Sequence, residues 1–416
     1  MTRMRRRLAA SIVLIALFGA ACGSDDDGDT NATGADTSES TETTESHSDM
    51  GGSNAAGFKG AYGNVREAYA HMYETGNVLT GAIAKQKGFA DEGENKAAAT
   101  RATLSRLLGE HALLASVATT KGLAGASDFE AAAGALDENS VELAAVVGSV
   151  YGEEAQNEFL KQWRDHIRMF VDYTKATAGK DKAGQDKAVQ ELGGYVKNFG
   201  NFLATATGLP PAAVQEALNA HVGQLKGAVD AAAAGNFEEA YAKVSEAYHH
   251  MMVTADALAG GISKQNNLGD PKTKQSETDI ALSSLLGEHA ALAALATTKG
   301  VEGAPDFGAV AGQLDKNSVQ LADLIGSVYG DGAKNEFLKQ WRDHIRMFVD
   351  YTKATAGDDK AGQDKAVQEL GGYIKNFGSF LATATGLPTD AVQKSLEAHV
   401  MQLKTALDDY AGAIDS

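Results

Sequence analysis

Residues 157–179, NEFLKQWRDHIRMFVDYTKATAG, occur again without a single change at residues 335–357. The apolar side chains of this stretch recur at three- and four-residue spacing, which places them on one face of an α-helix. They are Phe159, Trp163, Ile167 and Phe170, followed by Thr174 on the same face. The stretch therefore predicts an amphipathic helix that is present twice in the chain.

The duplication extends far beyond this helix. The sequence from about Phe58 to Ala232 is repeated from about Phe237 to Ala411, and the offset between the copies changes by one residue near 89–96. An insertion or deletion is tolerated best in a loop. We therefore expect two homologous domains, residues 57–234 and residues 235–416, with a loop near residues 89–96.

Apolar residues recur at helical spacing throughout each copy, and strand-like alternation is missing. In the first copy the expected helices cover about 59–86, 95–120, 128–150, 153–178, 182–207 and 211–233. Gly208 suits a helix end, and Pro210 suits the start of the next helix. Because short loops join these helices, we predict an all-α fold of two tandem up-down helical bundles.

The first 22 residues have the features of an export signal. Arginines precede an apolar run, and the run leads to Gly19-Ala20-Ala21-Cys22. This ending resembles a bacterial lipobox, in which the cysteine is lipidated. Cys22 is the only cysteine, so it cannot form a disulfide within the chain. The sequence predicts an extracytoplasmic protein that is lipid-anchored to the bacterial cell membrane through Cys22, and an ordinary cleaved secretory signal is the alternative.

Residues 23–56 are rich in Ser, Thr, Asp, Glu and Gly. Such a segment buries too little apolar surface to offset the entropy lost on ordering, so it is expected to be a disordered tether. The whole chain is acidic, with 55 Asp and Glu against 37 Lys and Arg. This charge disfavours nucleic acid and anionic lipid surfaces as partners. Contact with a membrane is therefore expected through the N-terminal lipid only.

Four histidines of the first copy reappear at matching places in the second. The candidate metal ligands are His71, His111, His166 and His221, with their counterparts His250, His289, His344 and His399. His111 and His221 fall near the centres of their apolar faces and survive where neighbouring residues have changed. Facing helices of a bundle commonly supply ligands to metal or haem in this way, and imidazole suits copper and zinc. Candidate partners of the ligands are Glu67, Glu110, Asp165 and Tyr69.

Other interpretations of these histidines remain open. Buried imidazoles are often satisfied by a carboxylate or a backbone carbonyl in a purely structural network. No HxxH or HExxH spacing occurs, and no ExxH spacing ends at one of the eight candidate histidines, so no two of these ligands are fixed on one helix. The methionines next to the histidines, Met72 and Met169, suit Cu(I) if they point inward and suit core packing otherwise.

Several motifs resemble a little-characterised helical repeat of secreted bacterial proteins. They include LLGEHALLASVATTKG, GSVYGEEA, WRDHIRMFVDYTKATA and FLATATGLP, and the resemblance covers residues 58–411. Some relatives of this kind carry the label "copper amine oxidase". The chain lacks the Asn-Tyr-Asp/Glu motif whose tyrosine becomes the quinone of true copper amine oxidases. The resemblance thus implies the fold and export, is compatible with copper, and argues against the oxidase reaction.

These observations favour a non-enzymatic binding lipoprotein of the cell envelope that holds a metal ion, copper or zinc, or haem. The alternative is a scaffold that binds an envelope protein partner and uses the histidines only in its core. An enzyme is the third hypothesis, because no nucleophile–base pair or phosphate loop is visible in the sequence.

Overall fold

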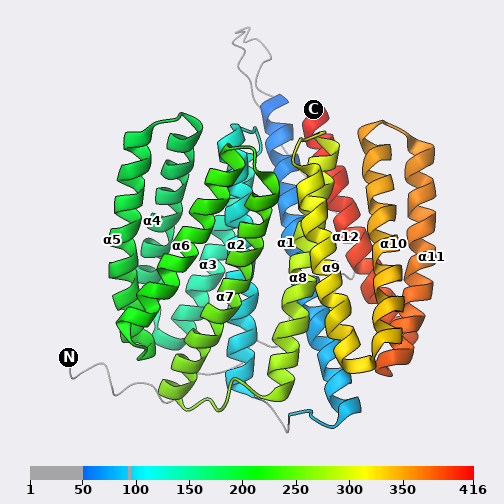
Figure 1. The fold of residues 1–416 in the computed structure, drawn as a ribbon, viewed down its shortest axis with the longest axis horizontal. Coiled ribbons are helices and arrows are strands. Elements are labelled where there is room, and N and C mark those ends of the chain that lie inside the picture. The colour runs from blue at the N-terminus through cyan, green and yellow to red at the C-terminus, as the bar shows by residue number, and fades with distance from the viewer. Residues whose placement is uncertain (1–49, 92–94) are drawn as a thin grey trace, which may run out of the picture. The chain divides into compact units, whose positions relative to one another are not determined.

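The computed structural model describes residues 50–91 and 95–416, and this part of the chain is all-α, as predicted. Figure 1 shows its twelve helices. Those of the first copy are α1 (Met50–Lys87), α2 (Lys96–Ala124), α3 (Phe129–Tyr151), α4 (Glu153–Ala178), α5 (Lys182–Thr207) and α6 (Pro211–Ala233). Those of the second copy are α7 (Phe237–Asn266), α8 (Lys274–Val301), α9 (Phe307–Tyr329), α10 (Asp331–Ala356), α11 (Lys360–Thr385) and α12 (Thr389–Asp415).

The expected helix ends of the first copy agree with the structure to within one residue, except at the start of α1 and at the end of α2, which continues to Ala124 instead of ending near residue 120. Helix α1 begins at Met50, whereas the sequence predicted a disordered tether to residue 56. Packing explains the difference, because Phe58 is buried against Tyr410 of α12 and Gly57 lies beside Ala413. Tertiary contact thus stabilises a helix start that its composition does not favour. The predicted signal peptide, Cys22 and tether residues 23–49 lie outside the described residues.

The two copies exchange their first helices. Helix α1 packs against α8 and α12 of the second copy and makes few contacts with α2, which follows it in the chain. Helix α7 packs against α2 and α6 of the first copy and hardly contacts α8. Figure 1 shows α1 beside α8 and α12, and α7 beside α6 and α2. We therefore call α2–α7 the first bundle, and α8–α12 with α1 the second bundle.

The loops that carry the chain between the bundles contact each other. The loop before α2 is one residue longer than the loop before α8, so the predicted site of the indel is confirmed. The Asp91 backbone N–H donates to Gln275 Oε1 at 2.8 Å, and Thr273 Oγ1 donates to Asp91 Oδ2 at 2.8 Å. Asn95 also donates to the carbonyl of Asp270 at 3.0 Å. These bonds fix the two crossing segments beside one another.

Glycines allow the exchanged helices α1 and α7 to pack closely against helices of the other copy. A Cβ on Gly76 of α1 would lie 2.6 Å from Ser283 Cα of α8. A Cβ on Gly109 of α2 would lie 2.7 Å from the ring of Tyr248, and the Tyr248 hydroxyl lies 3.3 Å from that of Tyr69. Since such distances are too short for a real Cβ, the packing of α1 and α7 depends on these two glycines.

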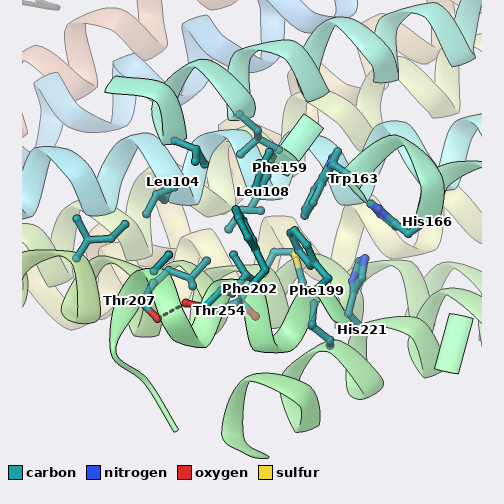
Figure 2. Close-up of a pocket in the computed structure, with 18 of the residues that line it drawn as sticks. Leu104, Leu108, Phe159, Trp163, His166, Phe199, Phe202, Thr207, His221 and Thr254 are labelled. Atoms are coloured by element: carbon teal, nitrogen blue, oxygen red, sulfur yellow. Dashed lines mark hydrogen bonds between the residues drawn. The ribbon is translucent and has the colours of Figure 1, made fainter. Parts of the chain in front are cut away.

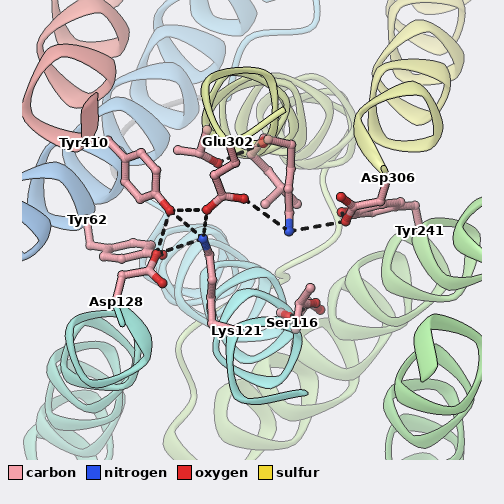
Figure 3. A network of polar contacts seen from close by, with 12 residues as sticks. Tyr62, Ser116, Lys121, Asp128, Tyr241, Glu302, Asp306 and Tyr410 are labelled. Carbon is pink, nitrogen blue, oxygen red and sulfur yellow. Dashed lines mark hydrogen bonds and ion pairs between the residues drawn. The ribbon is translucent and has the colours of Figure 1, made fainter. Parts of the chain in front are cut away.

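A network of buried charges joins the bundles at the end of α2 and α8 (Figure 3). Lys121 lies 2.9 Å from Asp128 and pairs with Glu302 of the other copy. The equivalent Lys299 lies 3.4 Å from Asp306 and 3.7 Å from the same Glu302. Burial raises the pKa of Asp128, but Lys121 and the hydroxyls of Tyr62 and Tyr410 together lower it by more, and the net shift is downward. The network thus contains ionised groups, and the Glu302 carboxylate interacts with one lysine of each bundle.

Helix α8 alone among the described helices is long and apolar enough to cross a membrane, and 78% of its most apolar window is buried inside the protein. It contacts α1, α9, α10 and α12. This burial is typical of the central helix of a bundle.

The helix exchange predicts which fragments fold. A fragment of residues 95–268 contains all of α2–α7 and should unfold cooperatively, because it keeps the contacts of α7. A fragment of residues 57–236 is a complete sequence copy of similar length, but it leaves α1 without α8 and α12, and we expect it to unfold at a lower temperature. Circular dichroism during heating measures the unfolding midpoint of each fragment. A higher midpoint for 57–236 would contradict the exchange.

Candidate metal centre

Three histidines of each copy converge in the core of a bundle. His111, His166 and His221 come from α2, α4 and α6 and form the first cluster. Their counterparts His289, His344 and His399 come from α8, α10 and α12 and form the second cluster. Each of the six side chains is at most 5% exposed. The clusters therefore consist of imidazoles that water barely reaches.

The second cluster has the geometry of a metal site. One ring nitrogen from each histidine lies within 4.8 Å of the others. The Nε2 atoms of His289 and His344 are 3.4 Å apart. Two nitrogens bound tetrahedrally to one ion at 2.0–2.1 Å are separated by about 3.4 Å. This pair thus already has the spacing of two ligands, and a small movement of His399 completes a three-nitrogen set.

The first cluster is slightly wider. The ring centres of His111 and His221 are 6.0 Å apart, against 5.8 Å for His289 and His399. The ring centres of His111 and His166 are 5.4 Å apart, against 5.3 Å for His289 and His344. The same arrangement is therefore present in both bundles, and the second cluster is the more compact.

Aromatic rings hold the imidazoles in place. Trp163 lies against both His111 and His166, with ring centres 4.6 Å and 4.7 Å away. Tyr195 stacks on His166 at 4.9 Å. In the second bundle Trp341 and Tyr373 make the equivalent contacts. The tryptophans were predicted as core residues, which is confirmed. Sequence reasoning missed the tyrosines, because their stretch is nearly identical in the two copies and offers no contrast.

Most nitrogens of the clusters have no hydrogen-bond partner in the described part of the chain. Both ring nitrogens are unpaired in His111, His221 and His399, and so is Nδ1 of His166, His289 and His344. Buried polar atoms normally have partners, and leaving one unpaired costs about 1–3 kcal/mol. Nε2 of His289 and Nε2 of His344 are within hydrogen-bonding distance of each other. Because each neutral imidazole has one N–H and one lone pair, the clusters hold several donors and acceptors without partners in an apolar surrounding.

These imidazoles are neutral at physiological pH. Burial lowers the pKa of His166 to about 3 and that of His221 to about 4, and neighbouring histidines add to the shift. Burial likewise lowers the pKa of His344 and of His399 to about 3. The pKa values of His111 and His289 are lowered for the same reasons. Neutral imidazole is the form that binds a metal ion, so protons do not compete with one near pH 7.

The remaining two predicted ligands lie outside the clusters. Nε2–H of His71 donates to the Ser395 carbonyl at 2.9 Å, and Nε2–H of His250 donates to the Ala217 carbonyl at 2.9 Å. Because α1 and α7 are exchanged, His71 approaches His399 of the other copy, whereas the sequence placed it with His111, His166 and His221. Each bundle therefore brings together three candidate ligands from one copy, with a fourth histidine nearby from the other.

The acidic residue beside each central histidine does not contact the cluster. Glu110 accepts bonds from Arg66 at 2.9 Å and from Asn139 at 2.8 Å. Glu288 accepts bonds from Ser245 and Asn317, and it lies 3.3 Å from His249. Tyr69, another predicted partner of the histidine ligands, donates to the Arg106 carbonyl at 3.1 Å. The carboxylates anchor neighbouring helices, and the histidine clusters carry no compensating negative charge from them.

None of the protein-family models, curated proteins or solved structures that were compared with the chain matches it.

The lowered pKa values predict a dependence of stability on pH. Between pH 7.5 and pH 5 the unfolded chain binds protons on these histidines, since their ordinary pKa is about 6.5, while the folded protein does not. The free energy of unfolding should therefore fall as the pH falls through this range. Urea unfolding with a chelator present measures this fall. His221→Leu should reduce the slope by about one proton, and the exposed control Thr205→Ala should not. Equal slopes of unfolding free energy against pH in the wild-type protein and in His221→Leu would contradict the lowered pKa of His221.

Proposed function

We propose that this protein binds one transition-metal ion in each bundle and acts as a metal-binding protein rather than as an enzyme. The observation that carries the proposal is the convergence of one ring nitrogen each from His289, His344 and His399 in a buried site where both nitrogens of His399 have no hydrogen-bond partner. The first cluster repeats this arrangement with His111, His166 and His221. A structural network of histidines, the alternative function, accounts for the contact between His289 and His344 but not for the unpaired nitrogens of His399, since the neighbouring carboxylate bonds elsewhere.

A metal ion suits the clusters better than haem. Haem needs an open slot between helices, but the cavity that reaches the first cluster is about 70 Å³ and the one beside the second is about 20 Å³. A single water needs about 10–15 Å³ of such space, so these cavities hold only a few small groups. The ring planes of each cluster are also tilted, by 43° between His111 and His221, for example, and do not face one another across a gap.

The surroundings favour an ion of low charge. Three neutral imidazoles would surround it, and the buried walls are apolar and aromatic. A dication such as Zn²⁺ would have to bring hydroxide or another anion into this core, because an uncompensated buried charge is costly. Cu(I) carries a single charge, and copper accepts imidazole ligands. We therefore expect Cu(I) to bind more tightly than Zn²⁺.

The location of the protein is part of the proposal and rests on its sequence. A lipid on Cys22 would hold the bundles at the outer face of the cell membrane, connected by residues 23–49. At that location, two buried histidine clusters in one protein would suit the storage of metal ions or their transfer to another protein.

Metal titration tests the proposed function. Under anaerobic, reducing conditions, competition with a chromogenic Cu(I) chelator should show about two ions per chain. His344→Ala should remove the tighter site, because the second cluster is the more compact, and His166→Ala should remove the weaker one. His111→Ala combined with His289→Ala should remove both.

His71→Ala and His250→Ala are the matched controls, since each removes a histidine that lies next to a cluster. These two variants should keep both ions. Circular dichroism establishes that every variant is folded. A folded wild-type protein that takes up neither Cu(I) nor Zn²⁺ would disprove the proposal, and loss of binding only in the control variants would move the site to the exchanged helices.

A further inference from the structure

A cavity of about 70 Å³ extends from the first cluster along the core of the first bundle. Figure 2 shows Trp163, His166 and His221 at one end and Thr207 and Thr254 at the other. Its walls come from α2 to α7 and are almost wholly apolar. Most of the side chains in these walls are buried, and half-buried residues such as Phe202 and Leu258 line it as well.

The few polar groups of the cavity divide into two kinds. The hydroxyls of Thr207 and Thr254 donate to the carbonyls of Leu203 and His250 within their own helices, at 2.7 Å and 3.1 Å. At the other end the indole N–H of Trp163, Nδ1 of His166 and both nitrogens of His221 have no partner. An occupant therefore meets apolar walls along the length of the cavity and unpaired polar atoms only beside the histidines.

The duplication supplies a comparison for this cavity. Every lining residue has an identical counterpart in the second bundle except Val147, which is replaced by Ile325. Isoleucine is larger than valine by one methylene group, so less space is expected at the equivalent place in the second bundle. The cavity found beside the second cluster has other walls, among them Ala293, Thr297 and Phe348, and is about 20 Å³. The copies thus share the histidines but differ in the space next to them.

We propose that the first bundle binds a small, uncharged, apolar molecule in the cavity beside His166 and His221, and that the second bundle binds it much more weakly. Along its apolar length such a cavity accepts compact apolar molecules, since water gains too few hydrogen bonds there. Charged or strongly polar molecules are disfavoured because only the histidine end of the cavity offers them partners. This site goes beyond the proposed metal binding and does not require it.

The chain has one tryptophan per bundle, which makes the test direct. Trp341→Phe leaves Trp163, at the cavity, as the only tryptophan, which is excited selectively at the red edge of its absorption, where tyrosine does not absorb. Trp163→Phe leaves Trp341, at the equivalent place in the second bundle. Bromoform is the probe, because it is compact and apolar and its bromine atoms quench indole fluorescence on contact. With a chelator present, we expect saturable quenching of Trp163 at concentrations that leave Trp341 almost unaffected.

Swapping the residue types at positions 147 and 325, where the two bundles differ, completes the test. Val147→Ile in the Trp163 protein should weaken bromoform binding by about tenfold or more, as a methylene group can in an apolar pocket. Ile325→Val in the Trp341 protein should create saturable quenching there. Both changes are conservative, and circular dichroism checks the fold. Equal quenching of the two tryptophans, quenching that never saturates, or no effect of Val147→Ile would overturn the proposal. Because no metal is present, these results are independent of the metal titration.

Discussion

The packing of α1 against α8 and α12 determines how the rest of the structure is arranged. Once this helix belongs to the second bundle, α7 must close the first one, and the duplicated halves can no longer be separated along the chain. The approach is possible because glycines stand where a side chain would collide with the partner helix, at Gly76 and Gly109. The buried pairing of Lys121 and Lys299 with Glu302 then adds a charged contact between the halves that apolar packing alone would not specify.

Helical spacing places each histidine on the buried face of its helix, and contacts between helices of the bundle orient its imidazole ring. Residues three and four apart place each histidine on the buried face of its helix, and the aromatic rings of Trp163 and Tyr195 limit how its imidazole turns. The neighbouring carboxylate Glu110 is directed to Arg66 and Asn139 and so is kept away from the ring nitrogens. The result is an uncharged group of imidazoles, and at the proposed metal site these surroundings would favour an ion of low charge.

Much of this could be predicted from the sequence, and the reasons for the exceptions are physical. Glycine and proline signals marked the helix ends well, so the bounds of α4, α5 and α6 agree with the structure. Helical spacing also placed His111, His166 and His221 on buried faces. It could not show which bundle receives α1, because a loop of a few residues permits either a hairpin or a crossing. The positions of His71 and His250 depend on that choice, and so does the helical start at Met50, which needs α12 as its partner.

The exchange of helices also has a consequence for the order in which the protein can assemble. Helices α2 to α7 are consecutive, so the first bundle can close as soon as they are available. Helix α1 is synthesised first of the described helices, yet its partner α12 is the last of them, so part of its apolar face stays uncovered until α12 is present. Contacts so distant in sequence slow folding and leave apolar surface exposed meanwhile. A chain of this topology would gain from helper proteins that shield its first helix until the last one is available.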